Sequence, residues 1–248
     1  MSRTLLLTGG TGLIGSVQVR HFLEKGYFVV TTYRDDAKLK TLGVHDNLLG
    51  IKVPDLLASD AAQLIEDVLC ERNIFPDCLV NNACDTRWHA MEPDGHVSEE
   101  CFLNQYRINV ILPYELSWRL VHMRGSRLKK IVNVSSMYGI VPHNPQLYVH
   151  PETETPLQYA LAKAATLQLT KDLAIRFRDL GVVVNSVSYG GVEGRVDEAF
   201  KRRFEPLTPL RRMMKPEETI PAVEFLLEEE SHYMTGQNVV VDGGRTVW

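Results

Sequence analysis

Short apolar runs alternate with longer amphipathic segments along most of the chain. The short runs have the length of strands, and the segments between them repeat apolar residues at helical spacing. The predicted strands are Thr4–Thr8, Phe28–Thr32, Gly50–Val53, Cys78–Asn81, Lys130–Ser135, Val182–Ser188 and Asn238–Val241. The predicted helices lie near Gly12–Lys25, Ala37–Leu42, Ser59–Arg72, Glu99–His122, Pro156–Asp179 and Glu217–Glu228. This alternation predicts an α/β fold with a seven-stranded parallel sheet and helices on both faces.

Two segments interrupt the alternation. Val141–Thr155 is polar and contains prolines, and Gly190–Lys215 is basic and poor in helical periodicity. A long loop inside a compact domain usually carries function or is disordered. We therefore expect one domain over residues 1–248, with a substrate loop near 141–155 and a substrate-side segment near 190–215.

Composition excludes several classes of protein. The chain has 248 residues, 44% of them hydrophobic and 23% charged, close to the average of soluble globular domains. Its 27 basic and 31 acidic side chains give a net charge of −4, whereas nucleic-acid binders carry a basic excess or stripe. No apolar run approaches the roughly 20 residues of a membrane-spanning helix. We expect neither a nucleic-acid nor a membrane partner.

The start of the chain and the cysteine spacing indicate the compartment. The apolar run in the first ten residues is too short for the core of a signal peptide and ends in glycines. Cys70, Cys78, Cys84 and Cys101 show no Cys-x-x-Cys pair. We expect a cytoplasmic protein with reduced thiols and no bound metal.

A glycine-rich turn follows the first predicted strand. Residues 8–15 read Thr-Gly-Gly-Thr-Gly-Leu-Ile-Gly and lead directly into a predicted helix. Glycines at such a turn let the backbone approach a pyrophosphate, and the helix N-terminus offers free N–H groups and the positive end of its dipole. The order of strand, turn and helix predicts a Rossmann fold that binds a dinucleotide.

The end of the second strand indicates which dinucleotide is bound. An acidic residue there binds the ribose 2′-hydroxyl of NAD, and an arginine accepts the 2′-phosphate of NADP. Tyr33 takes the place of the acid and Arg34 follows, which favours NADP(H), with NAD(H) as the alternative. Arg34 could instead be a solvated side chain paired with Asp35 or Asp36. Asp55 is a candidate for the adenine amino group or else a loop cap.

A tyrosine and a lysine supply a candidate acid–base group. Tyr159 and Lys163 lie four residues apart on one face of a predicted helix. A tyrosine keeps its proton to about pH 10, and a nearby cation lowers that pKa by stabilising the phenolate. The pair can therefore act as a general acid or base. Ser135 and Ser136 end the fifth strand at the carboxyl edge of the sheet, where a hydroxyl can bind a carbonyl oxygen.

Taken together, these motifs resemble the compact, single-domain short-chain dehydrogenases/reductases. The resemblance covers nearly the whole chain through the glycine turn, Asn81-Asn82-Ala83, Asn109, the serine strand, the Tyr159 and Lys163 pair, Thr235-Gly236-Gln237 and Val241-Asp242-Gly243-Gly244. It implies a catalytic tetrad of Asn109, Ser136, Tyr159 and Lys163, with Ser135 as the fallback for the serine. Tyr159 would exchange a proton with the substrate oxygen, which Ser136 would orient. Lys163 would hold the nicotinamide ribose and lower the pKa of Tyr159, and Asn109 would support a water-linked proton path.

The resemblance also implies the contacts of the nicotinamide cofactor, which exchanges a hydride with the substrate carbon. Family members are commonly dimers or tetramers, so it further implies a homo-oligomer. The expected cofactor-binding residues are Gly9, Thr11, Gly12, Leu13, Ile14, Tyr33, Arg34, Asp55, Leu56, Asn82, Ala83, Tyr159, Lys163, Gly190 and Val192.

The chain departs from the family pattern at four places. Gly12 lies one position earlier than in the compact branch, and this spacing resembles the extended branch that acts on nucleotide sugars. Cys84 replaces a glycine, and we expect a small buried residue beside the cofactor. The usual proline and threonine after the sixth strand are missing. Ser136 and Tyr159 are 23 positions apart, wider than usual, because of the 141–155 loop.

We therefore predict an NADP(H)-dependent oxidoreductase that interconverts an alcohol and a carbonyl on a polar small molecule. The serine strand, the loop and the segment after the sixth strand are similar to those of dehydrogenases associated with flagellin and surface-glycan modification, which makes a sugar derivative the candidate substrate. The alternatives are an epimerase or dehydratase of nucleotide sugars and a non-catalytic dinucleotide-binding regulator. Trp88 and His89 either line the substrate pocket or serve ordinary packing.

Overall fold

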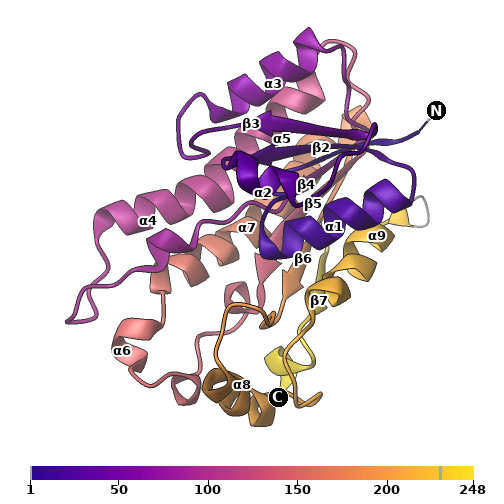
Figure 1. Cartoon of the computed structure of the whole chain (residues 1–248). Coiled ribbons are helices and arrows are strands. Elements are labelled where there is room, and N and C mark those ends of the chain that lie inside the picture. Colours follow the sequence, from indigo (N-terminus) through magenta and orange to yellow (C-terminus); the bar gives the residue numbers. More distant parts are fainter. Residues whose placement is uncertain (1, 229–230) are drawn as a thin grey trace.

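One parallel sheet lies between two layers of helices in the computed structural model, which describes residues 2–228 and 231–248 (Figure 1). Its strands are β1 Thr4–Leu7, β2 Phe28–Tyr33, β3 Leu48–Lys52, β4 Cys78–Asn81, β5 Lys130–Ser136, β6 Val183–Tyr189 and β7 Asn238–Val241. They pair in the order β3-β2-β1-β4-β5-β6-β7, and every pairing is parallel. The predicted α/β fold is confirmed, and each predicted strand is present.

Alternate side chains along the strands build hydrophobic cores on the two faces of the sheet. In β1, Leu6 packs on one face, whereas Leu5 and Leu7 pack on the other. The first face is covered by α3 (Ala61–Glu71), α5 (Leu112–His122) and α7 (Leu157–Arg176), and α4 (Glu99–Tyr106) packs beside α7. The second face is covered by α1 (Leu13–Glu24), α2 (Asp36–Lys40) and α9 (Ile220–Leu227). Among the helices described, none is both long enough and apolar enough to cross a membrane.

The helix predicted over Glu99–His122 is divided into two helices. α4 ends at Tyr106, Arg107–Ile111 form a π-helical turn, and α5 begins directly afterwards. Pro113 has no N–H, so the carbonyl of Asn109, four residues earlier, loses its α-helical partner. π-helical turns are frequent at functional sites. This one contains Asn109, a residue of the expected tetrad.

The two segments that interrupt the alternation contact each other. Residues 141–155 include the short helix α6 (Pro151–Glu154), and residues 190–215, expected to be helix-poor, include α8 (Glu198–Phe204). Asp197 begins α8 as an N-cap, a local signal that does not depend on long apolar periodicity. Arg203 Nε of α8 donates to the carbonyl of Leu147 at 2.7 Å. The two segments therefore form one structural unit beside the carboxyl ends of β5 and β6.

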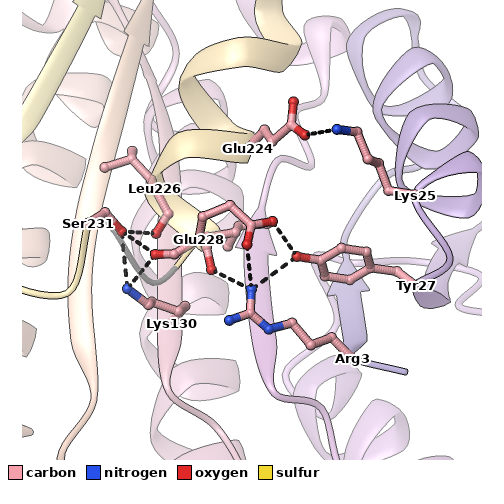
Figure 2. A network of polar contacts seen from close by, with 9 residues as sticks. Arg3, Lys25, Tyr27, Lys130, Glu224, Leu226, Glu228 and Ser231 are labelled. Atoms are coloured by element: carbon pink, nitrogen blue, oxygen red, sulfur yellow. Dashed lines mark hydrogen bonds and ion pairs between the residues drawn. The ribbon is translucent and has the colours of Figure 1, made fainter. Parts of the chain in front are cut away.

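A network of polar contacts joins α9 to the amino end of the sheet (Figure 2). The last carbonyls of a helix lack partners within the helix, and basic side chains commonly bind them. Arg3 Nη1 donates to the carbonyl of Leu227 at 3.2 Å and to Glu228 Oε2 at 3.0 Å. The Tyr27 hydroxyl donates to Glu228 Oε1 at 2.9 Å, and Lys130 Nζ donates to the Glu228 carbonyl at 3.0 Å. These contacts lie at the opposite end of the strands from the glycine turn.

Candidate active site

The glycine turn joins β1 to α1 where the strand order switches between β1 and β4, the position at which open α/β sheets bind ligands. Gly9 has a φ of 71°, and its carbonyl accepts the N–H of Gly12 at 3.0 Å. A Cβ on Gly15 would lie 2.3 Å from the carbonyl oxygen of Gly9, so only glycine lets α1 lie this close to the turn. The result is a backbone cradle at the N-terminus of a helix, which fits a pyrophosphate.

A cleft of about 510 Å³ opens at this turn. Asn82 and Ala83 border it, and their N–H groups donate to Thr8 Oγ1 at 3.0 and 3.1 Å. Asp55 also borders it and caps the following turn by accepting the N–H of Leu57 at 3.0 Å. The expected cofactor residues in the lining are Gly9, Thr11, Gly12, Leu13, Ile14, Tyr33, Arg34, Asp55, Leu56, Asn82 and Ala83. The cleft therefore fits the dinucleotide that the sequence predicts.

Cations outnumber carboxylates in the cleft lining. Its charged residues are Arg34, Lys38, Arg87, Arg195, Asp55 and Asp85. Arg34 does not pair with Asp35 or Asp36, as the alternative interpretation expected; its Nη1 lies 3.6 Å from Asp85 Oδ2. Asp35 instead caps α2, and Asp36 pairs with a lysine of β3. Arg87 binds Asp85 more closely, with Nε 3.0 Å from Oδ2, and its guanidinium lowers the pKa of that carboxyl.

Ser136, Tyr159 and Lys163 lie together at the carboxyl end of β5. Burial raises the pKa of Tyr159 above its usual value, and the nearby Ser136 hydroxyl opposes this shift. Lys163 Nζ lies 5.7 Å from the centre of the Tyr159 ring and donates to the carbonyl of Val134 at 2.8 Å. Burial also lowers the pKa of Lys163. Burial therefore raises the pKa of Tyr159, where the resemblance implies a lowering by Lys163.

The two adjacent serines of β5 have different partners. Successive side chains of a strand point to opposite faces of the sheet. Ser135 Oγ donates to the carbonyl of Lys163 at 2.9 Å and so ties β5 to α7. Ser136 Oγ accepts the N–H of Tyr138 at 3.2 Å and contacts Tyr159. The geometry brings Ser136, rather than the fallback Ser135, to the tyrosine.

Asn109 is buried in the π-helical turn. Its Nδ2 donates to the carbonyl and to Oε1 of Gln105, at 2.8 and 2.9 Å. Its carbonyl, deprived of an α-helical partner by Pro113, accepts the Thr166 hydroxyl of α7 at 3.0 Å. Its Oδ1 is buried and has no hydrogen-bond partner among the residues described. This oxygen can therefore accept a hydrogen bond from a bound molecule.

The segment after β6 holds the remaining expected cofactor residues. In the described part of the chain, the cleft lining does not extend to Gly190, to Val192 or to the Tyr–Lys pair. Gly190 donates its N–H to the carbonyl of Val241 in β7 at 2.9 Å, and Val192 forms a β-bridge with Met214. Two residues later, Gly194 packs against Leu13 of α1, and the next residue, an arginine, borders the cleft. The segment therefore connects β6 to the glycine turn.

Imidazole and phenol side chains gather around Tyr159. The His89 ring lies with its centroid 4.6 Å from that of Tyr159, which places it against the phenol. His143 stacks on Tyr138 at 3.8 Å, and the Tyr138 and Tyr148 hydroxyls are 2.9 Å apart. Sequence reasoning did not identify Tyr138, although its position two residues after Ser136 was the available signal.

Other polar residues of the 141–155 loop fold the loop itself. Asn144 Oδ1 accepts the N–H of Gln146 at 2.9 Å. Glu154 Oε2 accepts the N–H groups of Val149 and His150, which lowers the pKa of Glu154. These side chains stabilise the conformation of the loop, whereas His143 and Tyr148 belong to the group of side chains around Tyr159.

Cys84 differs from the expectation of a buried residue. Its side chain is exposed and borders the cofactor cleft. Enclosure in the cleft raises the pKa of the thiol, although Lys163 and Arg195 oppose this shift. Cys84 is therefore an accessible thiol in its protonated form.

Comparisons with known proteins agree with this geometry. Residues 12–246 match the family described as Enoyl-(Acyl carrier protein) reductase. An uncharacterized short-chain type dehydrogenase/reductase of Sinorhizobium fredii is 30% identical over 98% of this chain, which spans 43% of that longer protein. Glucose 1-dehydrogenase 2 of Bacillus subtilis is 25% identical over 99% of this chain and 95% of its own length. The crystal structure of a short chain dehydrogenase from Leptospira borgpetersenii with bound NAD⁺ has a TM-score of 0.87 and 28% identity, covering 99% of this chain and 93% of that one.

Proposed function

We propose, from the premise that the chain belongs to the short-chain dehydrogenase/reductase family, that it interconverts an alcohol and a carbonyl on a polar small molecule with NADP(H). The family supplies the alcohol/carbonyl chemistry and the nicotinamide cofactor. The observation that carries the assignment of roles is the position of Lys163 Nζ 5.7 Å from the centre of the Tyr159 ring, with the Ser136 hydroxyl on the same side of the sheet edge near the phenol. The choice of NADP(H), the polar substrate and the residue roles are our proposal.

The reaction needs a proton transfer that residues of this chain supply. When bound, the nicotinamide supplies or accepts the hydride. Tyr159 gives a proton to the carbonyl oxygen during reduction and takes it back during oxidation, while the Ser136 hydroxyl orients that oxygen. Burial keeps Tyr159 protonated, which suits the donating role. Lys163 would hold the nicotinamide ribose, and the unpartnered Asn109 Oδ1 would accept a hydrogen bond in the path that returns the proton.

The charges at the cofactor cleft support NADP(H). Arg34 follows β2, at the position that meets the ribose 2′ group in this fold. Its side chain is 57% exposed and shares Asp85 with Arg87, so its charge is only partly neutralised. Lys38 borders the same cleft. A 2′-phosphate would find more cations than carboxylates in this lining.

The surroundings of Tyr159 support a polar substrate. His89, His143, Tyr138 and Tyr148 place several hydrogen-bonding groups near the phenol. A pocket with such groups recognises hydroxyl-rich molecules better than simple hydrocarbons. A relative named for glucose is consistent with a sugar-derived substrate.

The Arg34→Ala variant tests the choice of cofactor. We expect about tenfold weaker NADPH binding, equivalent to about 1.4 kcal/mol, because the 2′-phosphate loses a cation. NADH lacks this phosphate, so its binding should change little. Fluorescence titrations at matched ionic strength measure both, with Lys52→Ala, which removes a charge outside the cleft, as the control. Unchanged NADPH binding in Arg34→Ala would remove Arg34 as the selector, and tighter NADH binding by the unaltered protein would overturn the NADP(H) assignment.

We also propose a homo-oligomer formed through α4, α5 and α7. These helices carry exposed apolar side chains that a partner could cover: Leu103, Tyr106, Trp118, Leu157, Leu161 and Ile175. Light scattering coupled to size exclusion should give the mass of a dimer or tetramer. A monomer at micromolar concentration would contradict this part of the proposal.

A further inference from the structure

His89 is a half-buried group beside Tyr159 that the proton transfer does not use. It ends the short 3₁₀ turn Thr86–His89, and its ring plane is inclined by 50° to that of Tyr159, with the centroids 4.6 Å apart. Its Nε2 is buried and has no hydrogen-bond partner among the residues described. A buried polar atom without a partner costs free energy, so such atoms in a native protein call for an explanation.

Two glutamines fix the backbone on both sides of His89. Gln158 Nε2 donates to the carbonyls of Trp88 and Ala90, at 2.9 and 3.2 Å. Gln105 Nε2 donates to the carbonyl of Asp85 at 2.9 Å, and both glutamines are buried. Because Gln158 immediately precedes Tyr159 in α7, the same turn of helix that carries the phenol holds the His89 loop. The imidazole therefore has a fixed position relative to the phenol.

A second imidazole approaches from the opposite segment. His143 stacks on Tyr138, and its Nε2 is also buried without a partner in the described part of the chain. Burial lowers the pKa of His89 to about 4. The nearby Lys163, His143 and Arg195 also lower this pKa, and Asp85 raises it. Burial alone lowers the pKa of His143 to about 4. Both rings are therefore neutral near pH 7, and each offers one donor and one acceptor.

We propose that His89 determines substrate specificity by hydrogen bonding, through Nε2, a hydroxyl on the carbon next to the reacting carbon. The substrate would then be a vicinal diol, or an α-hydroxy carbonyl in the reverse direction. Rings in contact at 4.6 Å can reach two neighbouring oxygens of one small molecule, the reacting oxygen at Tyr159 and the second at His89. A neutral imidazole suits a hydroxyl, which both donates and accepts, better than a carboxylate, which only accepts.

This inference deepens the proposed function and rests on its assignment of Tyr159 to the reacting oxygen. The test compares NADP⁺-dependent oxidation of cis-1,2-cyclohexanediol and of cyclohexanol, which differ by one hydroxyl. We expect kcat/KM for the diol to exceed that for cyclohexanol by about 10- to 100-fold, the effect of a hydrogen bond in a buried site. His89→Phe should abolish most of this preference through KM for the diol, and His89→Gln, which keeps a donor and an acceptor, should restore part of it.

Trp88→Phe is the matched control. Trp88 takes the packing role, since its side chain packs against the core on the first face of the sheet, so the change alters packing in the same loop and should leave the preference unchanged. A protein that does not prefer the diol, including one that oxidises neither compound, overturns the inference. An equal preference in His89→Phe overturns it as well. If the protein oxidises cyclohexanol and does not prefer the diol, the inference about His89 fails and the proposed function stands. If Tyr159→Phe oxidises either compound as fast as the unaltered protein does, the proposed function fails.

Discussion

The adjacent residues Ser135 and Ser136 at the end of β5 have different partners. Ser135 binds the backbone of α7, and Ser136 contacts the phenol of Tyr159. The resemblance favoured Ser136 over Ser135, because the family's serine usually lies three residues before a glycine, here Gly139. Alternation along a strand could not show which face carries Tyr159. In the structure, Ser135 faces the backbone carbonyl of Lys163 in α7, and Ser136 faces the Tyr159 phenol.

The two serines should respond differently to substitution by alanine. Ser136→Ala should lower kcat by about 10²- to 10³-fold, because a hydrogen-bond donor to the reacting oxygen is lost. Ser135→Ala should lower the free energy of unfolding by about 1 kcal/mol and leave kcat within a few-fold, because it removes one buried structural hydrogen bond. Steady-state kinetics and urea unfolding measure the two effects. A larger loss of kcat in Ser135→Ala would reverse the assignment.

Other features of the site could not be predicted from the sequence. Arg34 pairs with Asp85, fifty-one positions away, rather than with its neighbours, because the ends of β2 and β4 lie at the same edge of the sheet. The contact between His89 and Tyr159 likewise depends on the packing of a loop against α7. Local sequence identifies the types of reacting residue, whereas tertiary packing decides their partners and the pKa of Tyr159.

At the scale of elements, the strands were predictable because each is a short apolar run followed by a polar or glycine-containing turn. The division of Glu99–His122 was missed, although Pro113 within an apolar helical period was a usable signal. α8 was missed because its seven residues are too few to show apolar periodicity, and its Asp197 cap is a common residue outside helices too. Short helices formed by capping and tertiary packing are therefore the elements that the pattern does not resolve.

The π-helical turn should matter for activity more than for stability. Pro113→Ala restores an N–H that can bind the carbonyl of Asn109 and convert the turn to regular α-helix. We expect kcat to fall about tenfold because Asn109 shifts, and the melting temperature to stay equal or rise. Pro221→Ala, in the first turn of α9, is the matched control and should leave kcat unchanged. Equal kcat values in the two variants would argue against a role for the turn.

At the scale of the whole molecule, the proposed catalytic groups and a network of structural polar groups lie at opposite ends of the sheet. The Arg3, Tyr27 and Glu228 network ties residues more than two hundred positions apart at the amino end. No local pattern in the sequence indicates it, because its members meet only after the chain has wound back along the sheet. The carboxyl end, by contrast, carries recognisable motifs, because open α/β sheets bind their ligands at the carboxyl ends of the strands.

The half-buried rings of His89 and His143 should make folding stability depend on pH. The pKa values of His89 and His143 are lowered to about 4, so the folded chain binds fewer protons than the unfolded chain between pH 4 and about 6.5. The two histidines therefore contribute fully to the free energy of unfolding above pH 6.5, and this contribution is lost as the pH falls towards 4. For His89, the free energy of unfolding should change by at most about 1.4 kcal/mol per pH unit in this range. The less buried His143 should contribute a smaller change, because solvent screens its charge.

Urea unfolding between pH 6.5 and 4.5 separates the effect of the histidines from that of Glu218. Arg212 lowers the pKa of Glu218 to about 2, so the contribution of Glu218 to the free energy of unfolding is lost mainly below pH 4.5. His89→Gln and His143→Gln should each reduce the slope. His45→Gln, a substitution remote from Tyr159, serves as the control. A slope unaffected by both substitutions would mean that these rings do not remain neutral in the folded protein.

The central claim is that Tyr159 transfers the proton in an alcohol/carbonyl reaction with a nicotinamide cofactor. The most direct measurement is kcat and the NADPH dissociation constant of Tyr159→Phe, using the most rapidly converted compound of a polyol and hydroxycarbonyl panel. The fully exposed Tyr233 provides the matched control, Tyr233→Phe. We predict that Tyr159→Phe binds NADPH within about twofold of the unaltered protein and loses about 10²- to 10⁴-fold in kcat, the usual contribution of a general acid or base. An unchanged kcat would contradict the account.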